Sequence, residues 1–320
     1  MKQSTQYNVI LIQLRLWAGI ALLFLAEVSY GQQDAQYTQY MYKTVSVNPA
    51  YAGSRGNLSI AALYRSQWTG IDGAPKTQSL NAHSPIGYRG VGLGINIFNE
   101  QIGPTSETNF EADFSYTIYT SREGRLSFGA NVSANLLDIN FSQLDQDFSQ
   151  GQDPTLQEDI HNRFSPNFGA GVYYHDDHFY TGLSVPRILQ TTHFDSSNLS
   201  TASEQMNFYF IIGYVWDLNP WVKFKPSLLT KMVMGAPLQV DVSANFMFNE
   251  KFVLGAAYRW DAAVSAMVGF NISDGFLIGM AYDRETTALG AATFNDGSFE
   301  ILIRYDFVSN KSNLKSPRFF

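Results

Sequence analysis

Residues 238–248 read LQVDVSANFMF, so apolar and mostly polar side chains alternate along the whole segment. Successive side chains of a β-strand point to opposite faces, which gives this segment one apolar face and one wetter face. Similar stretches recur from residue 57 almost to the end of the chain. A soluble β-sandwich uses such strands too. Their number and length, together with a secretion signal in front of them, instead predict an all-β transmembrane antiparallel barrel of the outer membrane, with an apolar lipid face and a polar lumen.

Residues 1–31 have the features of a secretory signal peptide. Lys2 and Arg15 precede an apolar run at 16–26, and small residues follow this run. The run is much shorter than the roughly 20 residues that a membrane-spanning helix needs. We therefore predict cleavage rather than anchoring, with the mature chain beginning near Gln32.

The composition limits the class of partner and of chemistry. The formal net charge is -7, which disfavours nucleic acid as a partner. The chain has no cysteine, so disulfides and thiolate metal sites are excluded. Charged residues make up only 15% of the chain, and aromatic residues also 15%. Soluble domains carry roughly 25% charged residues, whereas membrane barrels place aromatic girdles at both interfaces.

Period-2 alternation predicts about fourteen strands, which form a barrel over 57–307 followed by a periplasmic tail at 308–320. An even number of strands predicts that both termini lie in the periplasm. The predicted strands lie near 57–66, 76–84, 88–98, 107–120, 124–138, 165–175, 177–186, 205–217, 220–232, 236–248, 251–260, 262–272, 275–284 and 297–307.

The predicted connections between strands sort by length. One series is tight and rich in turn residues, for example at 86–87, 121–123 and 249–250. The alternate series contains the long connections, which are expected on the extracellular side. They lie at 66–75, 99–106, 139–164, 187–204 and 285–296.

The chain also offers material to fill the lumen. Residues 32–56 precede the first predicted strand, and they are expected either to plug the lumen or to lie against the periplasmic rim. Several lumen-facing positions carry large side chains, such as Met247, Leu277 and Leu302. A lumen partly filled by protein is therefore expected, which weakens an interpretation as an open porin.

The two faces of the strands are expected to respond differently to substitution. Arginine at the lipid-facing positions Val240 or Ile303 is predicted to destabilise the barrel. Gln239→Arg or Glu300→Gln, on the opposite, lumen-facing side, is predicted to matter much less to folding.

The first long connection carries four candidate residues for partner binding: Arg65, Trp68, Asp72 and Lys76. Trp and Arg are enriched at interface hot spots. Trp68 can equally belong to the aromatic girdle at the lipid interface. In that case a neighbouring basic side chain would extend its charged end toward water. For Arg65 we expect a structural role facing the lumen.

The longest predicted loop, 139–164, is acidic and includes Asp145, Asp147 and Asp153. Calcium binding and docking of a basic partner are the functional interpretations. The spacing does not match an EF-hand loop, and charge clusters of this kind are usually solvated. We expect a solvated surface loop and keep these three acids as candidates for partner contact.

No constellation predicts catalysis or a cofactor. The segment 175–178 reads HDDH in a predicted tight turn, where side chains are expected to face solvent and a metal would bind adventitiously. His83 has neighbouring serines but no third residue that would complete a catalytic triad.

Several sequence blocks near the amino terminus occur in a fixed order. They are QYTQY at 36–40, NPAYAG at 48–53, YRSQW at 64–68 and GAPKTQ at 73–78, with KSPRFF at 315–320 at the other end. In these blocks the chain resembles the PorP/SprF family, outer-membrane proteins associated with the type IX secretion system of Bacteroidetes. The resemblance covers essentially the whole mature chain, and it implies a protein that is not an enzyme and carries no cofactor.

The resemblance also implies partners. These are a secreted surface protein, such as an adhesin of gliding cells, bound through its type IX C-terminal domain, and periplasmic components of the secretion and motor apparatus. The barrel itself would contact membrane lipids and lipopolysaccharide. The alternative function is an outer-membrane channel or porin for small or hydrophobic solutes, which a large, steady conductance in a planar bilayer would support.

Overall fold

A computed structural model describes residues 36–87, 90–143, 159–189, 206–234, 236–291 and 294–308. The predicted signal peptide at 1–31, and all but the first residue of the predicted tail, lie outside the described residues. Within the described ranges, no helix is long and apolar enough to cross a membrane. The strands are β1 (Ser59–Ser66), β2 (Lys76–Ile86), β3 (Val91–Ile102), β4 (Thr105–Tyr119), β5 (Arg125–Ile139), β6 (Ile160–His175), β7 (Phe179–Val185), β8 (Asn207–Tyr214), β9 (Trp216–Asn219), β10 (Val222–Val233), β11 (Gln239–Phe248), β12 (Phe252–Arg259), β13 (Ala263–Ser273), β14 (Phe276–Glu285) and β15 (Ser298–Asp306).

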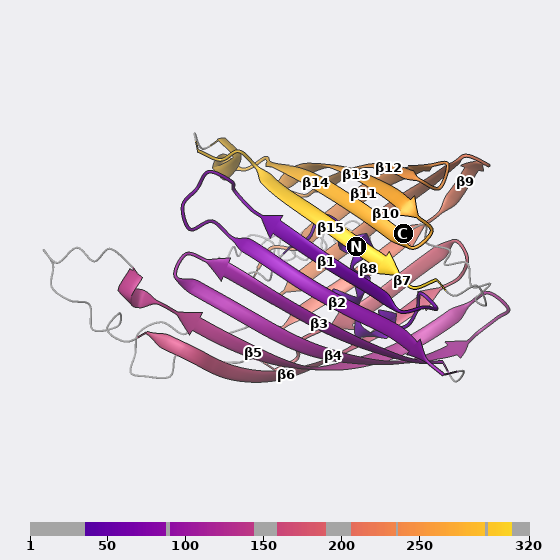
Figure 1. Cartoon of the computed structure of the whole chain (residues 1–320), viewed down its shortest axis with the longest axis horizontal. Helices are drawn as coiled ribbons and strands as arrows, with labels where there is room; N and C mark the ends of the chain where they lie inside the picture. The colour runs from indigo at the N-terminus through magenta and orange to yellow at the C-terminus, as the bar shows by residue number, and fades with distance from the viewer. Residues whose placement is uncertain are drawn as a thin grey trace, which may run out of the picture.

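The strands form one antiparallel sheet that closes into a barrel of fourteen strands (Figure 1). β1 and β15 form the closing seam, with Ser59 opposite Asp306 and Ser66 opposite Phe299. β9 continues β8 after a break at Val215, and both segments pair with β10, so they occupy one position in the wall. Closure pairs the sheet edges that would otherwise be left unsatisfied in lipid. The predicted fold class and strand number are confirmed.

The alternation in the sequence becomes the two faces of the barrel wall. On β11, Asp241 is buried toward the lumen and Val242 is exposed on the outside. On β15, Leu302 is fully buried between the exposed side chains of Ile301 and Ile303. The outside is therefore an apolar band, which is the surface that lipid tails require.

The connections sort to two rims. One rim carries short turns at 87–90, 120–124, 176–178, 220–221, 249–251 and 274–275. The other rim carries long connections at 67–75, 140–159, 186–206 and 286–297, with shorter ones at 103–104, 234–238 and 260–262. Because outer-membrane barrels have short periplasmic turns and longer extracellular loops, the first is called the periplasmic rim and the second the extracellular rim.

The predicted long connection at 99–106 is wrong. β3 and β4 continue as far as Ile102 and Thr105, which pair, so only Gly103 and Pro104 connect them. Gly103 has φ of 52°, as a two-residue hairpin with glycine in first position requires. The alternation disappears here because polar residues occupy both faces, although the backbone pairing continues.

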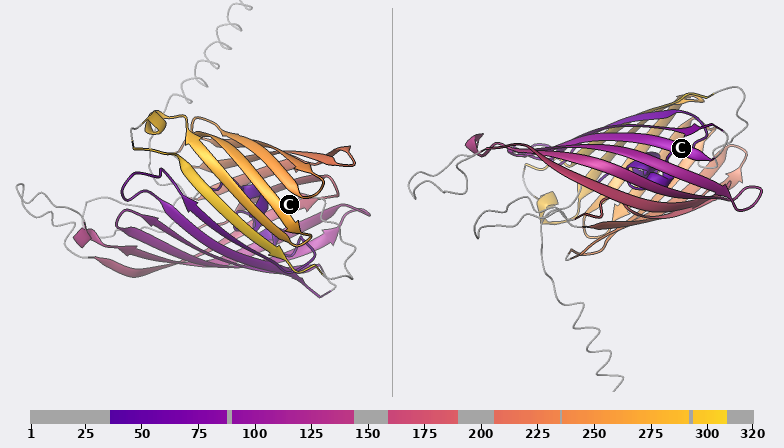
Figure 2. Two further views of the ribbon diagram at one scale, coloured as in Figure 1. Left: turned by 45° about the horizontal axis from the view of Figure 1, so that its top comes forward. Right: turned by 90° about the horizontal axis from the view of Figure 1, so that it is seen from below.

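Residues 36–56, called the plug below, lie inside the barrel, where Figure 2 shows the indigo segment surrounded by strands. The plug contains three short 3-10 turns, η1 (Tyr40–Tyr42), η2 (Thr44–Ser46) and η3 (Pro49–Tyr51). Two further turns, η4 (Phe141–Gln143) and η7 (Ala288–Ala291), belong to extracellular connections. The apolar side chains of the plug pack with buried lumen residues of the strands, including the predicted Met247, Leu277 and Leu302. Of the two positions expected for this segment, the structure shows the lumen.

Replacing Ile303 by arginine is expected to lower the free energy of unfolding by about 2–4 kcal/mol, because the charge would face the apolar interior of the bilayer. The matched control is Gln101→Arg, which places the same charge on the outer face at the exposed extracellular end of β3. Urea titration of folding into lipid vesicles measures both. Equal losses for the two variants would contradict the assignment of the lipid face.

Candidate functional site: the plugged lumen and its extracellular mouth

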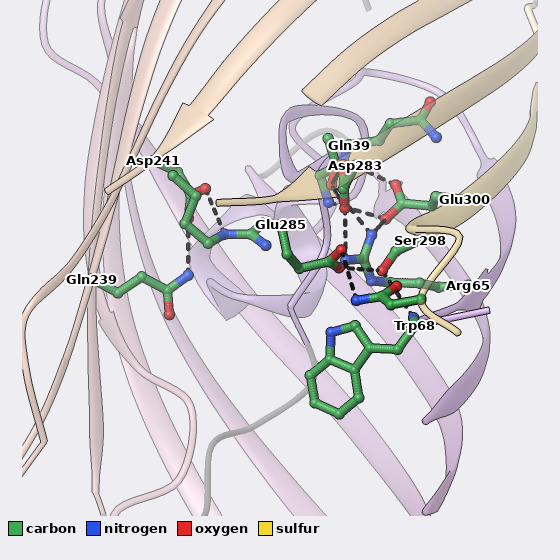
Figure 3. A network of polar contacts seen from close by, with 12 residues as sticks. Gln39, Arg65, Trp68, Gln239, Asp241, Asp283, Glu285, Ser298 and Glu300 are labelled. Atoms are coloured by element: carbon green, nitrogen blue, oxygen red, sulfur yellow. Dashed lines mark hydrogen bonds and ion pairs between the residues drawn. The ribbon is translucent and has the colours of Figure 1, made fainter. Parts of the chain in front are cut away.

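Arg65 lies in a buried polar network close to the extracellular rim (Figure 3). Its guanidinium group is 2.7 Å from Asp283 Oδ2 on β14 and 3.2 Å from Glu300 Oε2 on β15. The three residues are only 1–2% exposed. Charges buried this deeply lose their hydration, so the network needs additional hydrogen bonds to be favourable.

The plug supplies these hydrogen bonds. The Thr38 hydroxyl donates to the Asp283 carboxylate at 2.7 Å and accepts from Arg65 Nη1 at 3.2 Å. The backbone N–H groups of Thr38 and Gln39 donate to the two carboxylate oxygens of Glu300, at 3.0 and 2.9 Å. The network therefore joins β1, β14 and β15 to the first residues of the plug.

The middle of the plug is fixed to other strands. The Tyr40 hydroxyl lies 3.3 Å from Ser243 Oγ on β11. Asn48 Nδ2 donates to the carbonyl oxygens of Val172 on β6, at 3.0 Å, and Leu183 on β7, at 3.4 Å. The Ala50 backbone passes directly over Gly129. Any side chain at this position would overlap with that backbone, so only glycine fits there.

The last part of the plug reaches the periplasmic rim. Ser115 Oγ donates to the Ala52 carbonyl oxygen at 2.7 Å, and the Gly53 N–H donates to His83 Nδ1 at 3.1 Å. His83 is thus a lumen residue that is bonded to the plug. Arg55 then pairs with Asp306, the last residue of β15, at 2.7 Å.

The extracellular mouth, meaning the connections 67–75 and 286–297, is a joined pair of loops. The Thr69 N–H donates to the Gly297 carbonyl oxygen, and the Asp296 N–H donates to the Thr69 carbonyl oxygen, both at 2.8 Å. Gly70 has φ of 99° and lies against the Phe294 carbonyl oxygen, so a side chain does not fit there. These backbone contacts hold the two loops in one arrangement.

Side chains at the end of β14 form hydrogen bonds with the connection 286–297 and with Ser298 next to it. Arg284 donates to the carbonyl oxygens of Asn295 and Gly290, each at 2.9 Å. Glu285 accepts from Ser298 Oγ at 2.8 Å. The extracellular mouth is therefore connected to the wall next to the Arg65 network.

The structure separates the predicted site residues. Arg65 is buried and faces the lumen, in agreement with the structural role expected for it. Trp68 is half-buried in the mouth, with φ of 47° and its N–H donating to Ser298 Oγ at 3.2 Å. In Figure 3 its indole points away from Arg65 and Ser298.

The other candidates do not join this cluster. Asp72 and Lys76 are both exposed, and within the described residues no ion pair links them. Lys76 lies on the outer face of β2. Asp145, Asp147 and Asp153 lie outside the described residues.

The structure bears on two expectations about lumen and turn residues. The small effect of Glu300→Gln stays a prediction, although Glu300 is fully buried and bonded to the plug and to Arg65. The expectation that His175 faces solvent in a turn is wrong, because it ends β6 with only 2% of its surface exposed. Asp177 and His178 of the same segment are exposed, as expected, with His178 beside Asp217.

Sequence reasoning missed the partners of Arg65. Asp283 and Glu300 carry a detectable signal, since the alternation of β14 and β15 places both charges at lumen positions. Thr38 and Gln39 carry no such signal, because their contacts, made through the Thr38 hydroxyl and two backbone N–H groups, depend on the path of the plug.

No group of three or more histidine or acidic side chains within the described ranges is placed to hold a metal ion. Polar contacts inside the barrel connect the plug with the wall, as between Thr38 and Glu300, and also wall strands with one another, as between Arg259 and Asp241. The arrangement therefore supports a filled barrel with an ordered extracellular mouth.

A family model described as type IX secretion system membrane protein PorP/SprF matches residues 29–305. The chain belongs to the PorP/SprF family. It is a membrane β-barrel of type IX secretion, located in the outer membrane. The Arg65 network and the plug are thus features of a PorP/SprF barrel. No curated protein matches the chain.

Solved structures of outer-membrane barrels are similar at very low sequence identity. The outer membrane protein Omp33 of Acinetobacter baumannii is 7% identical, with 79% of this chain and 100% of that chain covered and a TM-score of 0.46. The Ralstonia pickettii toluene transporter TbuX is 12% identical, with 88% and 96% covered and a TM-score of 0.48. The CymD monoaromatic hydrocarbon channel is 9% identical, with 88% and 95% covered and a TM-score of 0.49. What these proteins transport does not carry over to the PorP/SprF barrel.

Proposed function

We propose that this barrel serves type IX secretion as a closed, non-enzymatic holder of a secreted cell-surface protein. It binds the C-terminal domain of an adhesin-like client at the extracellular mouth and helps to export or anchor it. The observation that carries the proposal is the filled lumen, in which the plug is bonded to strands on several sides of the wall.

A diffusion channel needs a continuous water path, and the plug opposes one. Between the plug and β8, β10, β11 and β12 there is a cavity of about 20 Å³, lined by residues including Tyr40, Tyr209 and Leu229. A cavity of that size holds on the order of one water molecule. Opening a wider path would separate the Thr38 and Gln39 backbone from Glu300 and leave buried charge unsatisfied.

The extracellular mouth has the properties of a docking surface. Its two loops are held by mutual backbone hydrogen bonds, so a partner would not have to order them on binding. Trp68 is half-buried there beside exposed Asp72, a combination of an aromatic anchor and a polar rim.

Trp68→Ala is expected to weaken client retention by about 2 kcal/mol, which corresponds to roughly a 30-fold loss of affinity, as for an aromatic hot spot. The measurement is the amount of client on intact cells and in the medium, by quantitative mass spectrometry. The matched control is Trp260→Ala, which removes an exposed tryptophan from the β12–β13 connection of the same rim.

The proposal predicts client in the medium, or missing from the surface, for Trp68→Ala but not for the control. Deletion of the whole gene must give the same phenotype more strongly. Unchanged secretion and adhesion in that deletion would refute the client role. A large, steady conductance of the wild-type barrel in a planar bilayer would favour the channel instead.

A further inference from the structure

The plug runs through the barrel in a definite direction. Its first described residues contact the ends of strands that border the extracellular rim. Gln36 Nε2 donates at 2.6 Å to Gln239, the first residue of β11 after the 234–238 connection. Thr38 contacts Asp283, two residues before the end of β14, and Glu300, two residues after the start of β15. Both positions adjoin the 286–297 connection of the extracellular mouth.

The other end of the plug contacts the periplasmic rim. Arg55 pairs at 2.7 Å with Asp306, where β15 ends beside the start of β1. Gly53 donates to His83 near the periplasmic end of β2. Gly53 and Gly56 have φ of 72° and 80°, so they supply the left-handed conformations with which the chain turns back into β1.

Contacts between these ends follow the same order. Tyr40 meets Ser243 on β11, Asn48 meets the carbonyl groups of β6 and β7, and Ala52 meets Ser115 toward the periplasmic end of β4. The path therefore descends through the lumen from the extracellular rim to the periplasmic rim, as the indigo segment inside the barrel in Figure 2 illustrates.

We propose that the chain preceding Gln36 leaves the barrel through the extracellular mouth, so that the amino-terminal end of the mature protein is presented at the cell surface. This reverses the periplasmic amino terminus expected from an even strand count. The expectation from an even number of strands counts only the strands of the wall. The plug crosses the membrane once more, inside the lumen, and is not part of the wall.

The topology has a consequence for assembly. The first residues of the plug are enclosed by β1, β14 and β15, which meet at the closing seam. The strands that close the barrel are therefore the same ones that hold the start of the plug, which links the placement of the plug to closure of the seam.

Site-specific cysteine labelling tests the proposal, because the natural chain has no cysteine. Gln33→Cys reports on the segment before the plug. Thr287→Cys, exposed in the 286–297 connection, marks the extracellular side, and Asp274→Cys, exposed in the β13–β14 turn, marks the periplasmic side. A membrane-impermeant maleimide is applied to intact cells and to cells with a permeabilised outer membrane.

In intact cells, we expect Gln33→Cys to be labelled as strongly as Thr287→Cys and at least about tenfold more than Asp274→Cys, with all three labelled after permeabilisation. Labelling of Gln33→Cys only after permeabilisation, or only after denaturation, would overturn the proposal. Labelling of Asp274→Cys but not of Thr287→Cys in intact cells would show that the two rims lie on the opposite sides of the membrane. This result would also overturn the proposal. An epitope inserted between Gln33 and Asp34, read by antibody on intact cells, gives a second measurement, and heat-modifiable migration confirms that each variant has folded.

Discussion

Replacing Arg65 by methionine is expected to lower the free energy of unfolding by about 3–5 kcal/mol, the loss typical of a buried ion pair from which one partner is removed. Methionine fills a similar volume but leaves the carboxylates of Asp283 and Glu300 buried together without their cation. Their remaining hydrogen-bond donors in the plug, the Thr38 hydroxyl and the backbone N–H groups of Thr38 and Gln39, are neutral. Lys43 of the plug and Arg259 still interact electrostatically with Glu300 and Asp283, but no ion pair joins them to these carboxylates among the described residues. Urea titration of folding into lipid vesicles measures the loss.

The control removes all three charges at once, in the variant Arg65→Met, Asp283→Asn, Glu300→Gln. Each amide oxygen can still accept a hydrogen bond from the plug, and only one of the two N–H groups bonded to Glu300 loses its acceptor. Replacing a complete buried ion network often costs little. We expect the triple variant to be more stable than Arg65→Met alone. A single variant as stable as the wild type, or a triple variant less stable than the single one, would show that charge balance is not what holds this part of the plug.

Replacing residues 36–56 by a glycine and serine linker of the same length is expected to convert a closed barrel into a conducting one. The linker keeps the chain connection but removes the side chains that pack with Leu63, Leu277 and Leu302. The wall behind the plug is rich in short polar residues, for example Ser115, Asn131 and Ser243, so water can enter the space that is left. Planar-bilayer recordings measure the effect as discrete steps of conductance in the variant only.

The wild-type barrel is the control in the same recordings, and heat-modifiable migration shows whether the linker variant has folded. A folded linker variant without conductance would mean that other parts of the chain close the barrel. Loss of folding would show that the plug is needed for assembly. The conductance would then be recorded for a second variant with two glycines inserted after Gly56, which loosens the plug but keeps its side chains.

The alternation of side chains was enough to predict the wall of the barrel. In segments such as 238–248, odd and even positions of the strand point to opposite faces. The local sequence is therefore enough to decide which side chains meet lipid. The same parity placed Arg65 in the lumen. It failed at 99–106, where polar residues on both faces left no periodic signal although the strands continue to Gly103.

The amino-acid sequence by itself therefore determined an exported outer-membrane barrel, the number of its strands and the side of each strand that faces lipid. The tertiary structure decided where the plug runs, which residues neutralise Arg65 and which loops form the mouth. Glu300 is 235 positions from Arg65 along the chain, and the two meet only because β15 closes against β1. The periodicity of a strand shows which of its two faces each residue lies on, but not which strands are its neighbours. The contacts of Thr38 and Gln39 depend on the path of the plug through the lumen, and two of them are made by backbone N–H groups that every residue except proline has, so no pattern in the sequence shows this path.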